Sequence, residues 1–140
     1  MSGWQHFAIA SAFFAGLTAL FGKLGVAQIN SNLATLIRTA VILGMTALIV
    51  AWRDEWEPLS KLSLRSVMFL ILSAVATGLS WLFYYRALQL GPASQVAPVD
   101  KLSLVFVIIL AWLFLGESLT WRTAAGGLLV LSGVLVLAKS

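Results

Sequence analysis

Five long apolar runs, separated by short polar segments, set the pattern of this 140-residue chain. Each run has the length of about 17–25 residues that a helix needs to cross the hydrocarbon core of a bilayer. The runs predict membrane-spanning helices over residues 4–22, 32–52, 66–86, 94–115 and 121–138. Pro58 and Pro92 lie in the polar segments, which fits their assignment as turns. We therefore expect residues 1–140 to form a single transmembrane domain.

The backbone of a chain in lipid must pair its own N–H and C=O groups, so only helices or closed barrels can span the membrane. Barrel strands alternate apolar and polar residues, whereas these runs are continuously apolar. Composition supports the same view, because 61% of the residues are hydrophobic and 10% are charged, against about 25% charged in soluble domains. The predicted fold is all-α, a multi-pass integral membrane bundle of five transmembrane helices with the lipid bilayer as its first partner.

The chain lacks the residues that several classes of function require. There is no Cys and the lone His6 has no neighbouring carboxylate, so no metal site is expected. The Lys and Arg residues are scattered rather than clustered, which argues against a nucleic-acid partner. We find no nucleophile–base pair and no phosphate-binding glycine loop. We therefore expect no enzyme activity, no catalytic residues and no cofactor. The N-terminus has no positively charged leader, so the first run is interpreted as a retained span.

The third predicted helix carries a polar face. Ser73, Thr77, Ser80 and Tyr84 are spaced four, three and four residues apart, which places them on one side of a helix, with Trp81 beside them. Hydroxyl groups gain nothing from facing lipid. Two interpretations follow: the face lines a cavity, or it forms hydrogen bonds with a neighbouring helix.

Arg38 is a charged residue inside the second predicted span, about 10 Å from its start at 1.5 Å per residue. A charge at mid-bilayer costs at least about 2.5–3.5 kcal/mol on insertion scales. One interpretation has the side chain reach back to the head groups. The other has it line a cavity, where it pairs with Asp100 or with an anionic group of a substrate.

Asp100 and Lys101 open a similar choice in the fourth predicted helix. Neighbours on a helix point about 100° apart, so we expect each charge to find its own partner rather than pair with the other. If Pro98 is the first helical residue, both charges lie at the interface and Asp100 stabilises the helix N-terminus. If Ser94 caps the helix and Pro98 kinks it, both charges lie about 9–10 Å inside the span and become candidates for function.

Positive charge is nearly balanced between the two sides of the membrane. The side of the N-terminus carries four cations: Arg53, Lys61, Arg65 and Arg122. The opposite side carries three, Lys23, Arg86 and Lys139, or five if Arg38 and Lys101 also reach it. Lys23 and Arg86, at helix ends, are expected to be interfacial anchors. With so small a bias the positive-inside rule selects no orientation. Copies inserted in both orientations would form an antiparallel homodimer, which we take as the expected assembly.

Several segments also resemble a known family. They are "FGKLG" at the end of the first run, "TLIRTAVI" around Arg38, "YYRALQLGPASQVAPVDKL" between the third and fourth runs, and "LAWLFLGESLTWRTAAGGLLVLSGVLVL" at the end. The chain resembles a single EamA-type unit of the drug/metabolite transporter superfamily. Typical members have two such units and move metabolites or amino acids across the inner membrane. The resemblance implies that this chain is one half of a ten-helix inverted-repeat transporter and needs a second copy.

These observations lead to one expected function and two alternatives. We expect a secondary transporter, an exporter of small polar or amphipathic metabolites across the cytoplasmic (inner) membrane, working by alternating access in the antiparallel dimer. Its substrate site is expected to comprise Arg38, Thr77, Ser80, Trp81, Tyr84, Asp100 and Lys101. Arg38 and Lys101 would bind anionic groups, while Asp100 would bind an amine or a coupling proton. The alternatives are a non-transporting membrane subunit of a larger complex and a flippase for lipid-linked sugars.

Overall fold

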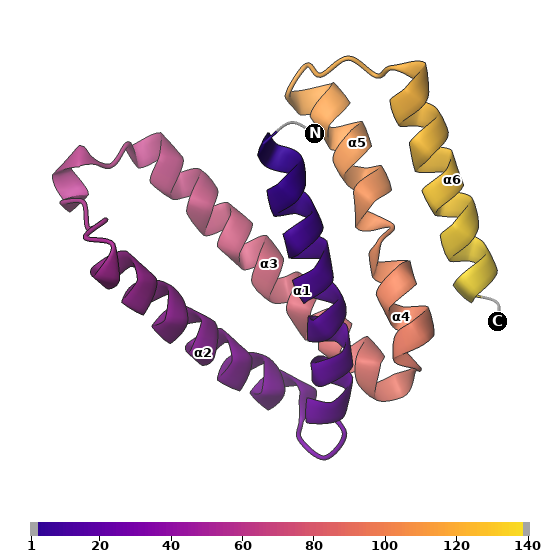
Figure 1. Cartoon of the computed structure of the whole chain (residues 1–140), viewed down its shortest axis with the longest axis horizontal. Coiled ribbons are helices and arrows are strands. Elements are labelled where there is room, and N and C mark those ends of the chain that lie inside the picture. The colour runs from indigo at the N-terminus through magenta and orange to yellow at the C-terminus, as the bar shows by residue number, and fades with distance from the viewer. Residues whose placement is uncertain (1–2, 139–140) are drawn as a thin grey trace. The chain divides into compact units, whose positions relative to one another are not determined.

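The computed structural model describes residues 3–138, and within them it contains helices and no strand. The helices are α1 (Gly3–Gly25), α2 (Ser31–Trp52), α3 (Leu64–Leu90), α4 (Ala93–Asp100), α5 (Ser103–Phe114) and α6 (Trp121–Ala138), with a short 3-10 turn η1 (Leu59–Lys61) (Figure 1). Five helical spans are long and apolar enough to cross a membrane, and α4 and α5 together form one of them. The predicted fold class, an all-helical five-span membrane protein, is confirmed.

The chain divides into two compact units. The α2–α3 unit comprises residues 22–89, that is, the last turn of α1, α2 and nearly all of α3. The terminal unit comprises residues 3–21 and 90–138, that is, most of α1 with α4, α5 and α6.

Local sequence explains where α2 and α3 begin and end. Asn30 caps α2, since its Oδ1 accepts a hydrogen bond from the backbone N–H of Asn32 at 2.9 Å. α3 extends from Leu64 to Leu90, beyond the predicted 66–86 at both ends. The apolar run sets the predicted limits, but the helix continues until the Gly91-Pro92 pair, where the backbone can no longer propagate it. The longer α3 includes Gln89, which bonds to the α1–α2 turn.

The most deeply buried residues of the α2–α3 unit lie where the α1–α2 turn meets the end of α3. Leu88 and Val26 are fully buried, and Tyr85 is 4% exposed. The Nζ of Lys23 donates a hydrogen bond to the carbonyl of Leu88, and the Nε2 of Gln89 donates to the carbonyls of Val26 and Ile29 at 3.1 and 2.7 Å. These bonds, which we call the α1–α2 clamp, occupy carbonyls that no helix would otherwise pair. They hold the turn against the end of α3.

In the terminal unit, α6 lies beside both α4 and α5. Thr120 caps α6, because its Oγ1 accepts a hydrogen bond from the backbone N–H of Thr123 at 3.2 Å. Gly127 is buried, and a Cβ added there would lie 3.2 Å from Cδ1 of Ile108. The missing side chain therefore allows α6 to approach α5 closely, as small residues do between helices in lipid.

The fourth span is broken in its first half. α4 begins at Ala93, directly after Pro92, and ends at Asp100; α5 starts at Ser103. Through the junction the backbone bonds shorten to the i→i−3 pattern, with the Lys101 N–H donating to Pro98 at 2.9 Å and the Leu102 N–H to Val99 at 3.0 Å. Pro98 lies inside α4, so the alternative that starts the helix at Pro98 is wrong. Since proline removes one backbone donor and its ring crowds the preceding turn, it weakens the helix just before the break.

Candidate functional site

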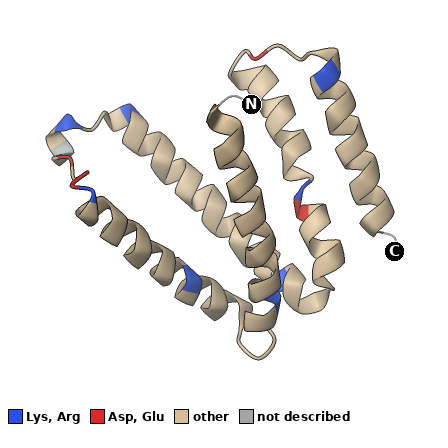
Figure 2. Ribbon diagram, viewed as in Figure 1, with Lys and Arg blue, Asp and Glu red and all other residues tan. Residues whose placement is uncertain are grey.

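Charged residues are mostly placed at helix ends and in loops (Figure 2). The exceptions are a cation within α2, which is Arg38, and an acid–base pair at the α4–α5 junction, which is Asp100 with Lys101. Charges inside a span are expensive in lipid and usually face the protein interior or a polar path. These two places, one in each unit, are therefore the candidate site.

Arg38 lies over an aromatic ring of the facing helix. Its guanidinium carbon is 3.1 Å from the centroid of the Trp81 ring and 5.9 Å from that of Tyr85. Both distances fall within the roughly 6 Å over which a cation is attracted to the face of an aromatic ring. The contact joins α2 to α3, which lie near each other at this end of the unit and diverge toward the 53–63 loop (Figure 1).

Three aromatic rings of α3 form the support for this cation. Trp81 meets Tyr84 edge to face at 5.8 Å between ring centroids, and it meets Tyr85 at 5.8 Å in a tilted arrangement. Tyr85 is held by its neighbours, since it is buried and its ring lies so close to Gly22 that a Cβ there would be 2.9 Å from Cε1. The cluster is therefore anchored on one side by the end of α1 and the α1–α2 clamp.

No carboxylate compensates Arg38 within its own unit. Among residues 22–89 the acid that forms an ion pair is Glu55, and it contacts Arg53 at 3.2 Å on an exposed loop. Asp100 belongs to the other unit, so the expected pairing of Arg38 with Asp100 stays a prediction. What the α2–α3 unit contains is a cation that lies against aromatic rings.

The polar face of α3 is exposed within the α2–α3 unit. Ser73, Thr77 and Ser80 are all exposed, and Tyr84 is half-buried. The hydroxyl of Thr77 donates to the carbonyl of Ser73 at 2.8 Å, within its own helix rather than to another one. This bond favours an accessible polar surface over the interhelical hydrogen bonding of the second interpretation. Ser80, Trp81 and Tyr84 form its end nearest Arg38.

Asp100 and Lys101 contact each other at the α4–α5 junction. The Nζ of Lys101 is 3.6 Å from Oδ2 of Asp100, and the two side chains are 50% and 38% exposed. The expectation that they diverge and do not pair is wrong. It assumed a continuous helix, whereas Lys101 caps α4 and the chain turns at that residue. Asp100 is the eighth residue of a 22-residue span, so the pair lies about 10 Å along it.

Four contributors to the α2–α3 unit were not predicted as parts of the site: Gly22, Lys23, Tyr85 and Gln89. Lys23 was expected to be an interfacial anchor, but it donates to the carbonyl of Leu88. Tyr85 follows Trp81 by one helical turn, and that spacing was the available signal. The long-range partners of Gly22, Lys23 and Gln89 are at least 60 residues away in sequence, so local patterns carry no trace of them.

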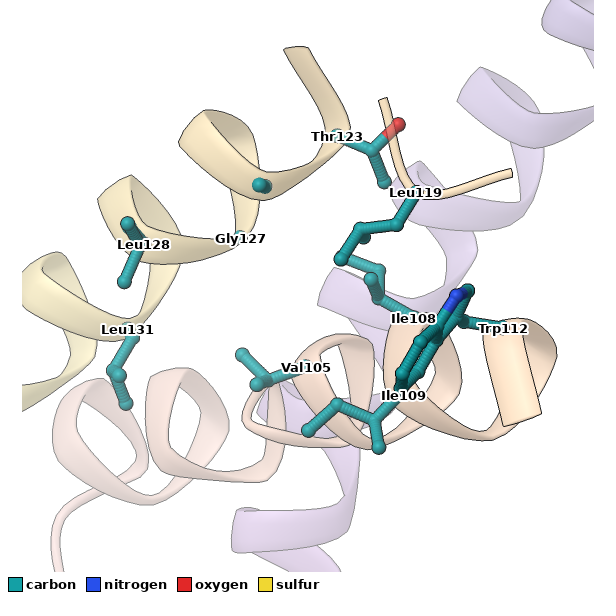
Figure 3. A pocket seen from close by; sticks show the side chains of 10 residues that line it. Val105, Ile108, Ile109, Trp112, Leu119, Thr123, Gly127, Leu128 and Leu131 are labelled. Atoms are coloured by element: carbon teal, nitrogen blue, oxygen red, sulfur yellow. The ribbon is translucent and has the colours of Figure 1, made fainter. Parts of the chain in front are cut away.

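A groove of about 250 Å³ runs between α5 and α6 of the terminal unit (Figure 3). Its walls are apolar apart from Thr123, whose hydroxyl lies 2.8 Å from that of Thr120. Sites for polar ligands combine an apolar wall with several polar groups that orient the ligand. This groove lacks that set, and we assign it to helix or lipid packing.

Comparison with known proteins adds one family and one relative. The model described as the EamA-like transporter family matches residues 3–139. A curated protein from a Sinorhizobium species, named "Uncharacterized transporter in cobO 3'region", is 54% identical over 135 residues, which is 96% of this chain and 96% of that protein. No solved structure matches the chain.

Proposed function

Because the chain belongs to the EamA-like transporter family, a family of multi-pass membrane transporters, we propose that it is a secondary transporter of small polar or amphipathic metabolites. The proposed direction is export across the cytoplasmic membrane. The membrane-transporter assignment rests on the family and on the related transporter.

The observation that carries the proposal is the broken fourth span with an acid and a base at the break. Transporters often bind substrate near the bilayer centre at discontinuous helices, whose irregular backbone is tolerated only where it is buried in protein or lines a cavity. Asp100 and Lys101 lie at such a break, about 10 Å along the span. A break without a polar task would place two charges in lipid at a cost of several kcal/mol. We assign the pair to substrate binding, with Asp100 taking an amine or a coupling proton.

Alternating access requires two halves that move against each other, and one five-span chain supplies one half. An antiparallel pair of copies would form the inverted repeat on which many transporters are built. The nearly even Lys and Arg content of the two sides supports insertion in both orientations. In this dimer the site would include Arg38, Thr77, Ser80, Trp81 and Tyr84 together with the charged pair.

The test is exchange of a labelled metabolite pool by purified protein in liposomes. Asp100→Asn keeps the size of the side chain and removes its charge, so we expect it to abolish exchange, and Arg38→Gln to reduce it strongly. Glu117→Gln is the matched control, because Glu117 lies in the exposed turn between α5 and α6, and it should exchange like the wild type. Exchange that survives both Asp100→Asn and Arg38→Gln would refute the site. Absence of any exchange, with a single orientation, would favour the membrane-subunit alternative.

A further inference from the structure

The Arg38 guanidinium is oriented as well as located by the Trp81 ring. A planar ion whose carbon lies 3.1 Å above a ring centroid can avoid overlap only by lying nearly parallel to the ring. Its N–H donors lie in the plane of the ion and form a rigid fork. They therefore point outward alongside the ring face, where a ligand can meet them edge-on.

Those donors have no partner among the side chains of their own unit. Within residues 22–89 the Arg38 guanidinium contacts the rings of Trp81 and Tyr85 and interacts electrostatically with Tyr84, and no hydrogen bond or ion pair engages it. The other cations at this end donate hydrogen bonds elsewhere: Lys23 to the carbonyl of Leu88, and Arg86 to Oε1 of Gln89 at 3.1 Å. Arg38 is thus a single, oriented positive charge in a membrane span.

We propose that Arg38 is a receptor for the carboxylate of an amphipathic metabolite, and that Trp81 is the residue that positions it. The inference rests on the proposed transport function and names its substrate class. A carboxylate accepts two parallel N–H bonds from the guanidinium fork. One cation matches one negative charge, whereas a phosphate monoester carries about 1.5–2 at neutral pH. The apolar body of the ligand would lie against the half-buried rings of Trp81 and Tyr84 beside Arg38.

Binding of benzoate and hexanoate to the purified protein in detergent tests the proposal, with benzamide and hexanamide as uncharged probes of the same shape. Calorimetry should give a Kd for each carboxylate at least about tenfold lower than for its amide, since hydrogen bonds to charged groups contribute about 1.5–3 kcal/mol. Arg38→Lys keeps the charge but loses the planar fork, and should raise the Kd of both carboxylates at least about tenfold.

Trp81 is tested by two variants and a control. Trp81→Leu removes the ring and should raise the Kd as much as Arg38→Lys does, although the charge remains. Trp81→Phe keeps a smaller ring and should give an intermediate Kd, which a merely structural role would not produce. Trp52→Leu is the control, because Trp52 is 89% exposed at the far end of α2, and it should bind like the wild type. Helical circular dichroism identifies any misfolded variant; if Trp81→Leu misfolds, Arg38→Lys and Trp81→Phe decide.

Several results would overturn the proposal. Amides that bind as well as carboxylates would do so, as would a wild-type Kd in Arg38→Lys and Trp81→Phe. Loss of binding in Lys101→Gln, with Arg38→Lys unaffected, would move the anion site to the α4–α5 junction. If liposomes exchange a metabolite pool but the protein binds neither carboxylate, the substrate class is wrong while the transport function stands. If neither exchange nor binding occurs, both fail.

Discussion

At the scale of single residues, the placement of Arg38 is an energetic balance. An Arg at the centre of a span costs about 2.5–3.5 kcal/mol on insertion scales, and Arg38 lies short of the centre, about 10 Å from the start of α2. A desolvated cation–π contact contributes about 2 kcal/mol. The ring of Trp81, with Tyr85 beside it, therefore offsets much of that cost without a carboxylate. This balance favours the cavity-lining interpretation over a side chain extended toward the head groups. It also leaves the hydrogen-bonding capacity of Arg38 for a ligand.

We predict that the position of the Tyr85 ring depends on the absence of a side chain at Gly22. In Gly22→Ala the new Cβ would lie 2.9 Å from Cε1 of Tyr85, whose ring is buried and cannot move aside freely. Overpacking of this kind costs about 1–3 kcal/mol, against about 1 kcal/mol that Ala gains over Gly in a helix. We expect a lower thermal unfolding midpoint in detergent and a weaker response to carboxylates.

The control for that substitution is Gly16→Ala in the same helix. An added Cβ at Gly16 meets nothing within 4 Å, so only the gain in helix propensity remains and the midpoint should stay the same or rise. Equal shifts in the two variants would show that the Gly22–Tyr85 contact does not limit the packing.

At the scale of elements, the decisive feature is the division of the fourth span into α4 and α5. Its overall length follows from the apolar run, and its break follows from Pro98 with the i→i−3 bonds after it. The break brings Asp100 and Lys101 within 3.6 Å of each other, where a continuous helix would separate them. The geometry of the charged pair is thus a consequence of helix interruption.

Replacement of Pro98 should therefore raise the stability of the protein and lower its transport activity. Pro98→Ala restores a backbone donor inside α4, and since Pro in a helix interior is about 3 kcal/mol less favourable than Ala, unfolding should require up to about that much more free energy. A continuous helix would separate the charged pair, so liposome exchange should slow. The measurements are the unfolding midpoint and the exchange rate of the same preparation.

Pro92→Ala serves as the comparison for Pro98→Ala. Pro92 precedes the first residue of α4, where a backbone N–H would have no helical partner in any case. Because Gly91 remains to end α3, this variant should change neither the unfolding midpoint nor the exchange rate appreciably. Exchange by Pro98→Ala at or above the wild-type rate would contradict the role of the break.

At the scale of the whole molecule, residues 3–138 supply five helical spans joined by short segments. A binding site for a polar metabolite must then be formed among the helices. Since one chain is one half of the expected inverted repeat, the proposal depends on a second copy in the opposite orientation. That requirement makes membrane orientation the property to measure.

Dual orientation predicts that C-terminal fusions report from both sides. A cytoplasmic fluorescent reporter and an extracytoplasmic phosphatase reporter should both be active on the wild-type chain. Replacing Lys61 and Arg65 by Gln removes two cations from the N-terminal side, so the opposite side becomes cytoplasmic. Fluorescence should rise, phosphatase activity should fall and exchange should decline.

Co-expression completes that experiment. A variant with Arg86→Gln and Lys139→Gln carries the opposite bias, and together with the first it should restore exchange, because the two populations form antiparallel pairs. Wild-type fusions active on one side only, or exchange undiminished in the biased variant alone, would rule out the antiparallel dimer.

The sequence by itself determined the elements of this protein. Membrane spans depend on the length and apolarity of local runs, because lipid forces each backbone group to pair within its own helix. The helical class and the five spans could therefore be predicted. The limits of α3 and the start of α4 depend on Gly and Pro residues just outside the runs, so these limits were predicted less accurately.

The partners of the charged side chains were decided only by the tertiary structure. Arg38 lies on Trp81, 43 positions later in the chain, and Lys23 donates to the carbonyl of Leu88, 65 positions later. The pairing of Asp100 with Lys101 needed the break after Pro98, which hydropathy does not record. Local periodicity places a residue on a helix face. Which face meets which is decided by helix packing, which depends on the small residues and hydrogen bonds of both helices together.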